Sequence, residues 1–117
     1  MNVCIIGGGL ISLTLAKALV NQGIYVDFFS SQKVEKINKT RTLGISKANV
    51  DFFNNNILNI KKLLWNIDKI EIYSENLKNE KILNFQDSEK NLFSIIKNYE
   101  LYETLLSSLR NDKLFKY

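Results

Sequence analysis

The chain has 117 residues, of which 45% are hydrophobic and 24% charged, the proportions of a globular protein with a single domain. It contains one cysteine and no histidine, which excludes a disulfide framework, a zinc cluster and catalysis by a Ser-His-Asp or Cys-His arrangement. The net charge of +4 arises mainly within residues 31–69, which carry eight basic and three acidic side chains. Only two of the 16 cations are arginines, which gives little support for nucleic-acid binding.

The apolar run from Val3 to Val20 has the features of neither a signal peptide nor a membrane span. No Lys or Arg precedes it, the glycines Gly7–Gly9 interrupt it, and Lys17 falls within it. It is also too short and too rich in glycine to cross a bilayer. We therefore expect a cytoplasmic protein with an uncleaved N-terminus. The basic middle of the chain leaves open a peripheral association with the inner membrane.

Residues 2–30 predict a βαβ unit. Val3–Ile6 is apolar at every position, as expected of a strand buried on both faces of a parallel sheet. Leu10–Gln22 has apolar residues at helical spacing, and Gly23 is placed to end this helix in the left-handed conformation. Ile24–Phe29 is a second apolar run. The fold class is therefore α/β with a Rossmann-like dinucleotide-binding core.

Beyond residue 30 the sequence predicts additional helices and a β-hairpin within one domain of residues 1–117. The expected helices are Lys47 to about Asn56 with Ser46 as N-cap, a turn or two within Ile60–Trp65, and a final helix capped by Asn98 with Leu101, Leu105, Leu106 and Leu109 on its apolar face. The expected strands are Ile70–Tyr73 and Lys81–Phe85, paired around a turn at Asn76–Asn79, and a further strand at Leu92–Ile96.

A glycine motif carries the chemistry of this sequence. Residues 7–12, Gly-Gly-Gly-Leu-Ile-Ser, have the form G-x-G-x-x-S between the first predicted strand and helix. In such a motif the first glycine makes the turn, the second admits a pyrophosphate, and the N–H groups at the helix start face the phosphates. Two positions depart from the pattern: Ser12 replaces the third glycine, and Ser30 lies where a ribose-binding carboxylate is expected. A glycine turn without any ligand is the alternative.

Several stretches together resemble a known family. Val3–Ser30 resembles the FAD-binding segment of flavoprotein monooxygenases. Arg41–Ser46, Leu64-Trp65 and Phe93–Asn98 resemble, in order and spacing, stretches of the ubiquinone-biosynthesis aromatic hydroxylases, which belong to the para-hydroxybenzoate hydroxylase fold class. The resemblance implies an FAD-dependent monooxygenase, an oxidoreductase that hydroxylates a small aromatic quinone precursor.

The resemblance also implies cofactor-binding roles for particular residues. They are Gly7, Gly9 and the backbone of Leu10 and Ile11 at the FAD pyrophosphate, Ser30 in place of the family's ribose-binding Glu with Ser31 beside it, Arg41 reaching the FAD from the loop after the second strand, and Asn98 on the flavin side. Arg41 as a solvated loop charge and Asn98 as a helix cap alone are the alternatives. No catalytic residue and no metal ligand is predicted, and Cys4, Trp65 and the tyrosines are expected to serve packing.

The second FAD motif of the family, an Asp-Gly pair in a glycine-rich setting, has no match here, because no glycine follows Gly44. The later Gly-Asp motif and the substrate sheet are missing as well. We therefore expect the FAD-binding portion only, with a non-catalytic remnant or dinucleotide-binding module as the alternative. A nicotinamide-dependent Rossmann protein is a third candidate, but the hairpin and the likeness after residue 40 argue against it. No arginine stands at the second strand's tip for the 2′-phosphate of NADP.

Overall fold

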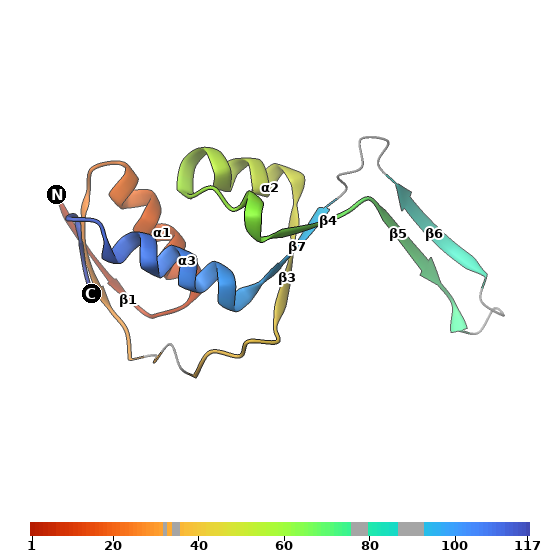
Figure 1. Cartoon of the computed structure of the whole chain (residues 1–117), viewed down its shortest axis with the longest axis horizontal. Helices are drawn as coiled ribbons and strands as arrows, with labels where there is room; N and C mark the ends of the chain where they lie inside the picture. Colours follow the sequence, from red (N-terminus) through yellow and green to blue (C-terminus); the bar gives the residue numbers. More distant parts are fainter. Residues whose placement is uncertain (32, 34–35, 76–79, 87–92) are drawn as a thin grey trace.

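The structure is a computed structural model, shown in Figure 1, and it describes residues 1–31, 33, 36–75, 80–86 and 93–117. It is an α/β structure, as the sequence predicts, with two three-stranded sheets and a two-stranded hairpin. The turn predicted at residues 76–79 lies outside the described residues.

The first sheet confirms the predicted βαβ unit. Strand β1 (Asn2–Ile6) leads into helix α1 (Leu10–Asn21), which returns the chain to strand β2 (Tyr25–Phe29) parallel to β1. Gly23 ends the connection from α1 with a φ of 77°, a left-handed conformation that glycine adopts without strain. A short strand that the sequence did not reveal, β8 (Phe115–Lys116), pairs in parallel with β2, so the strand order is β1-β2-β8.

The hydrophobic core lies between this sheet and two helices, α1 and α3 (Asn98–Arg110), which pack on one side of it (Figure 1). The predicted apolar face of α3 is buried, and its members are Leu101, Leu105, Leu106 and Leu109. Ala16 of α1 is fully buried, which permits the close approach of helix and sheet. Each large buried side chain of this kind stabilises the fold by about 1.5–3 kcal/mol.

The other face of the first sheet is uncovered, which corrects the prediction that the first strand is buried on both faces. Val3 and Ile5 face the helices, whereas Cys4 and Ile6 point to the opposite side. Cys4 is exposed, so its expected place in the core is wrong, and Ile6 is 84% exposed. The reason is that no described element packs against this side of β1.

The second sheet is antiparallel, with β7 (Phe93–Lys97) between β3 (Thr42–Ser46) and β4 (Leu64–Ile67). Strand β7 confirms the strand predicted there, apart from residue 92, which lies outside the described residues. The sequence did not predict β3, and the helical turn expected before Trp65 is only a 3₁₀ turn at Lys61–Leu63 that runs into β4. Trp65 is 64% exposed, so its expected packing role is wrong.

Helix α2 (Lys47–Phe52) begins where the sequence predicts. The Ser46 hydroxyl accepts a hydrogen bond of 3.3 Å from the backbone N–H of Asn49, the arrangement of an N-cap. The helix then widens into a π-helical turn over Phe53–Ile57, which ends near the predicted boundary.

The start of α3 differs from the prediction. Lys97 is the N-cap in extended conformation, and no side chain caps the helix. Asn98 is instead the first helical residue, so its expected role as the cap is wrong. Glu100 in the first turn and Arg110 in the last match the helix dipole.

The predicted hairpin is confirmed and projects from the rest of the molecule. It consists of β5 (Lys69–Tyr73) and β6 (Lys81–Gln86), which pair antiparallel with an irregularity after Ile72. Figure 1 shows it extending beyond β4, away from helices α1 and α3. The radius of gyration is accordingly 17.8 Å, compared with about 13 Å for a compact domain of this length.

Candidate dinucleotide-binding site

The glycine turn is formed at the carboxyl end of β1. The Gly7 N–H donates a 2.8 Å hydrogen bond to the carbonyl of Phe29, which extends the ladder between β1 and β2 by one residue. Gly7 has a φ of +121°, a conformation in which a side chain is strained. The chain can therefore leave the sheet sharply at Gly7 and enter α1 at Leu10, three residues later.

The start of α1 has the properties of an anion-binding site. Gly9 is the N-cap and has no side chain to cap the helix, and the first turn carries no acidic residue. The N–H groups of Leu10 and Ile11 belong to the first turn, where a helix supplies no acceptor. A Cβ placed on Gly9 would meet no atom within 4 Å, so open space lies against the helix end. These residues fit a pyrophosphate, which needs close backbone approach and free donors.

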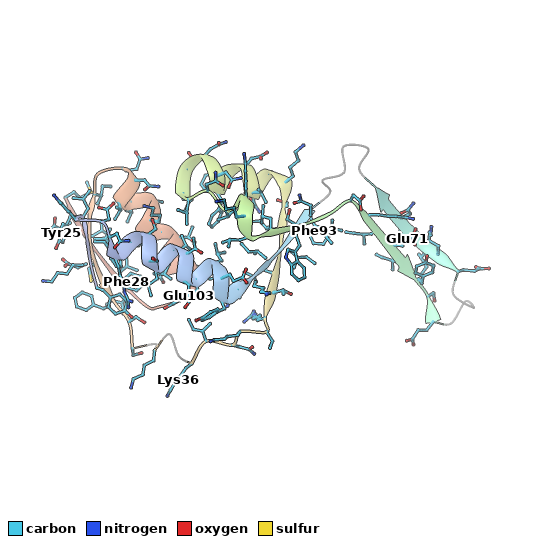
Figure 2. The ribbon with its side chains drawn as sticks, viewed as in Figure 1. Tyr25, Phe28, Lys36, Glu71, Phe93 and Glu103 are labelled. Atoms are coloured by element: carbon cyan, nitrogen blue, oxygen red, sulfur yellow. The ribbon has the colours of Figure 1, made fainter. Side chains whose placement is uncertain are left out.

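The tip of β2 lies beside this turn. Ser30 directly follows Phe29, the residue that bonds Gly7, and is half-buried, while Ser31 is exposed. Cations are found along the loop that follows: Lys33 and Lys36 are exposed, and Figure 2 shows the Lys36 side chain directed away from the body of the molecule. The structure thus brings Ser30 and Ser31 to the same sheet edge as the glycine turn.

Arg41 and Asn98 form a second group. The backbone N–H of Asn98 donates a 2.9 Å hydrogen bond to the carbonyl of Arg41, which joins the residue before β3 to the first residue of α3. Arg41 is exposed and Asn98 is half-buried. Nearby, the Lys39 ammonium lies 4.7 Å from the centre of the Tyr99 ring, a cation–π contact that holds this loop against α3.

An apolar groove of about 540 Å³ connects the helix start with the second sheet, and the sequence did not reveal it. Its walls include Leu10 and Ile11 of α1, residues 43–45 of β3, and Phe52. A Cβ on Gly44 would lie 3.2 Å from the Phe93 ring, which makes glycine the best fit there. One feature of the sequence could have indicated this groove: α1 also carries apolar residues outside its buried face, such as Leu15.

Charged and polar side chains also lie away from the glycine turn, within the described part of the chain. Among the residues described, no group of three His, Cys, Asp or Glu could hold a metal ion. On the hairpin, Lys69, Lys81 and the Tyr73 hydroxyl all contact the Glu71 carboxylate. These hydrogen bonds, that of Lys69 first, lower the pKa of Glu71 to about 2. In Figure 2, Glu71 lies on the hairpin, far from the glycine turn.

The Tyr102 hydroxyl is buried and has no hydrogen-bond partner among the described residues, and burial raises its pKa. Its ring belongs to the core between α3 and the first sheet, as expected of a packing tyrosine. In the described part of the chain, no helix is long and apolar enough to cross a membrane.

No family model and no curated protein sequence matches the chain, but its fold has clear counterparts among solved structures. The p-nitrophenol 4-monooxygenase PnpA of Pseudomonas putida superimposes with a TM-score of 0.79 at 14% identity, over 97% of this chain and 31% of PnpA. PqsL of P. aeruginosa superimposes with a TM-score of 0.79 at 17% identity, over 99% of this chain and 33% of PqsL. HpxO of Klebsiella pneumoniae, complexed with FAD and uric acid, superimposes with a TM-score of 0.73 at 17% identity, over 92% of this chain and 28% of HpxO.

The chain therefore has the fold of part of a flavin hydroxylase, beginning with a Rossmann-like unit. It spans about a third of the length of these neighbours.

Proposed function

We propose that this chain is the FAD-binding portion of a flavoprotein monooxygenase. The observation that carries the proposal is the uncapped start of α1 next to Gly7, with open space at Gly9, at the carboxyl edge of a parallel sheet. Dinucleotides bind at this position in Rossmann-like folds. The neighbour HpxO is complexed with FAD, which supports FAD as the dinucleotide.

Two sets of residues at this edge of the sheet would have separate roles. Gly7, Gly9 and the N–H groups of Leu10 and Ile11 would hold the pyrophosphate, because they offer donors without a side-chain obstacle. Ser30 and Ser31 would bond the ribose from the tip of β2. A bound flavin supplies the oxidation–reduction chemistry, and the chain's own part is to bind and orient it.

Arg41 and Asn98 would act together. Arg41 adds a positive charge in a loop that already carries Lys33, Lys36 and Lys39, which favours a ligand with two phosphates. The bond from the Asn98 N–H to the Arg41 carbonyl fixes the backbone from which the guanidinium extends.

We propose further that the substrate of the complete enzyme is an aromatic precursor of a quinone, as in ubiquinone biosynthesis. The stretches that resemble those hydroxylases are Arg41–Ser46, Leu64-Trp65 and Phe93–Asn98. They are far apart in sequence, yet they contribute the neighbouring strands β3, β4 and β7 of one sheet, so the likeness concerns a single structural unit. We propose that the protein is cytoplasmic, and the exposed lysines of residues 33–39 support a peripheral association with a membrane surface.

The full activity of a hydroxylase is proposed only for this chain together with further polypeptide. A cofactor-binding module without turnover is the second candidate, and the coverage of about a third of each neighbour favours it for the chain alone.

The test is a calorimetric titration of the purified chain with FAD, NAD and NADP. FAD should bind most tightly, and tighter binding of NADP would contradict the proposal. Gly9→Val should weaken FAD binding at least tenfold, because its side chain enters the open space at the helix start, where a Cβ meets no protein atom within 4 Å. The matched control is Gln22→Val at the exposed other end of the same helix, which should bind FAD as the unaltered chain does. Circular dichroism checks that both variants fold.

A further inference from the structure

A polar cavity lies between α2 and the second sheet, apart from the candidate dinucleotide site. Its volume is about 280 Å³, at the lower limit of the ~300–1,000 Å³ that is typical of small-molecule pockets. It shares no lining residue with the glycine turn, with the tip of β2 or with the apolar groove. Its wall includes the apolar residues Val50 and Leu64, and its polar lining residues are Lys47, Asp51, Asn54, Lys61, Asn66 and Ser94.

Two regular spacings bring these residues together. Positions 47, 50, 51 and 54 follow the helical spacing i, i+3, i+4 and i+7, so they share one side of α2 and of the π-helical turn after it. Leu64 and Asn66 alternate along β4, and Ser94 of β7 is paired with Asn66 across the sheet. The cavity is therefore lined by one side of a helix and by the sheet face next to it.

The side-chain amides of Asn54 and Asn66 are held as hydrogen-bond donors. The hydroxyl of Ser94, a residue that is 4% exposed, donates a 2.9 Å hydrogen bond to Oδ1 of Asn66. The N–H of Ile60 donates a 2.8 Å hydrogen bond to Oδ1 of Asn54. Since both bonds use the amide oxygen, each amide keeps its two Nδ2 hydrogens for another acceptor.

The charge of the lining also favours an anion. Lys47 and Lys61 contribute two positive charges and Asp51 one negative charge, which leaves a net charge of +1. Lys61 begins the 3₁₀ turn, and its N–H donates a 3.1 Å hydrogen bond to Oδ1 of Asn59. Its neighbour Ile60 is fully buried. The Lys61 side chain therefore extends from a fixed backbone position at the cavity.

We propose that this cavity binds a small aliphatic monocarboxylate. The Lys61 ammonium and the Nδ2 groups of Asn54 and Asn66 bond the carboxylate, because a charged acceptor forms the stronger hydrogen bonds with such donors. Val50 and Leu64 are half-buried and provide apolar contacts for a short carbon chain.

Asp51 makes the site selective. Its carboxylate repels a second negative charge, so a dicarboxylate or a phosphate dianion binds less tightly than a monocarboxylate does. Because the cavity shares no residue with the candidate dinucleotide site, the proposal is independent of FAD binding, and either can fail without the other.

The probe is isovalerate, a branched monocarboxylate, and its binding is measured by NMR of the ¹⁵N-labelled chain at constant ionic strength. It should shift the side-chain amide resonances of Asn54 and Asn66, while succinate and phosphate should bind about tenfold more weakly. Lys61→Met removes the ammonium group but keeps an unbranched chain, so it should weaken isovalerate binding about tenfold. The matched control is Lys62→Met, in the same 3₁₀ turn but outside the lining of the cavity, which should bind isovalerate as the unaltered chain does.

Two further variants test the amide and the selectivity. Asn66→Asp keeps an acceptor for the Ser94 hydroxyl but replaces the donor group by a negative charge, so isovalerate binding should be lost. Asp51→Asn should raise the affinity for succinate to about that for isovalerate. Circular dichroism checks that each variant folds, and the two lysine variants alter only exposed side chains. Absence of shifts in the two side-chain amides, equal losses in the two lysine variants, or tighter binding of phosphate than of isovalerate overturns the proposal.

Discussion

The backbone N–H of Asn98 donates a 2.9 Å hydrogen bond to the carbonyl oxygen of Arg41. Two residues that the sequence links only through a family resemblance are thus in direct contact, 57 positions apart in the chain. The bond continues the pairing of β3 with β7, in which Thr42 is opposite Lys97. Since it uses the backbone of both residues, their side chains remain available for other contacts.

The contact leads to opposite expectations for two substitutions of Asn98. Proline fits the first position of a helix but has no N–H, so Asn98→Pro should lower the free energy of unfolding by about 0.5–1.5 kcal/mol through the loss of one hydrogen bond. Asn98→Ala keeps the N–H and removes no cap, so stability should hardly change. Urea denaturation followed by circular dichroism measures both effects.

The same pair of variants tests the cofactor role. If the Asn98 side chain contacts FAD, as the family resemblance implies, Asn98→Ala should weaken FAD binding several-fold at unchanged stability. Unchanged FAD affinity in Asn98→Ala would restrict Asn98 to a structural position at the start of α3.

The βαβ unit was predictable because local signals agree there: an apolar strand, a glycine turn, a helix of amphipathic spacing and a left-handed glycine at Gly23. The exposure of Cys4 was not predictable, because the sequence of an apolar strand does not tell whether one face of the strand or both are covered. Strand β3 was missed because Thr42–Ser46 contains a glycine and becomes a strand only by pairing with β7. The two residues of β8 likewise form a strand only because they pair with β2.

For the site, the glycine motif and the tip of β2 follow from sequence spacing, because Gly7 and Ser30 end adjacent parallel strands. The Arg41–Asn98 contact and the apolar groove depend on pairing between distant segments, which no local pattern encodes. Trp65 was expected to pack but is on the exposed side of β4, where the Lys97 ammonium lies 5.8 Å from the centre of its ring.

Ser30→Glu should tighten FAD binding about tenfold. Hydrogen bonds to a charged acceptor contribute about 1.5–3 kcal/mol, against about 1 kcal/mol for a neutral one, and Ser30 is at the strand tip where a carboxylate would reach a ribose. Titration calorimetry measures the change, with Ser107→Glu on α3 as the control that adds the same charge away from the site. Weaker binding by Ser30→Glu would show that the ribose is held elsewhere.

The hairpin should lose order in acid through Glu71. Its pKa in the folded state, about 2, is below the ordinary value of 4.5 because Lys69, Lys81 and Tyr73 bond the carboxylate. Ionised Glu71 therefore stabilises the hairpin above about pH 4.5, and this contribution disappears as the pH falls from 4.5 towards 2. The effect should be small and should weaken with added salt, since the group is near the surface.

Amide hydrogen exchange of β5 and β6 measures this dependence. Protection should fall slightly between pH 4.5 and 2 in the unaltered chain, after correction for the intrinsic exchange rate, and Glu71→Gln should show the slightly lower protection at every pH. Asp51→Asn removes an exposed carboxylate on α2 and should leave the hairpin unchanged. A Glu71→Gln hairpin with the original pH dependence would refute the assignment to this carboxylate.

The chain alone should bind FAD but hydroxylate no aromatic compound. Hydroxylation needs the substrate held against the flavin in a cavity that excludes water. The described residues provide the glycine turn and an open groove, in which Ile11 is 86% and Phe52 is 55% exposed, so water reaches the surfaces that such a cavity needs dry. The measurement supplies FAD, a reductant, oxygen and a panel of phenols, one of them prenylated, and seeks hydroxylated products by mass spectrometry. Product in amounts stoichiometric with the 117-residue chain would mean that these residues already enclose a substrate.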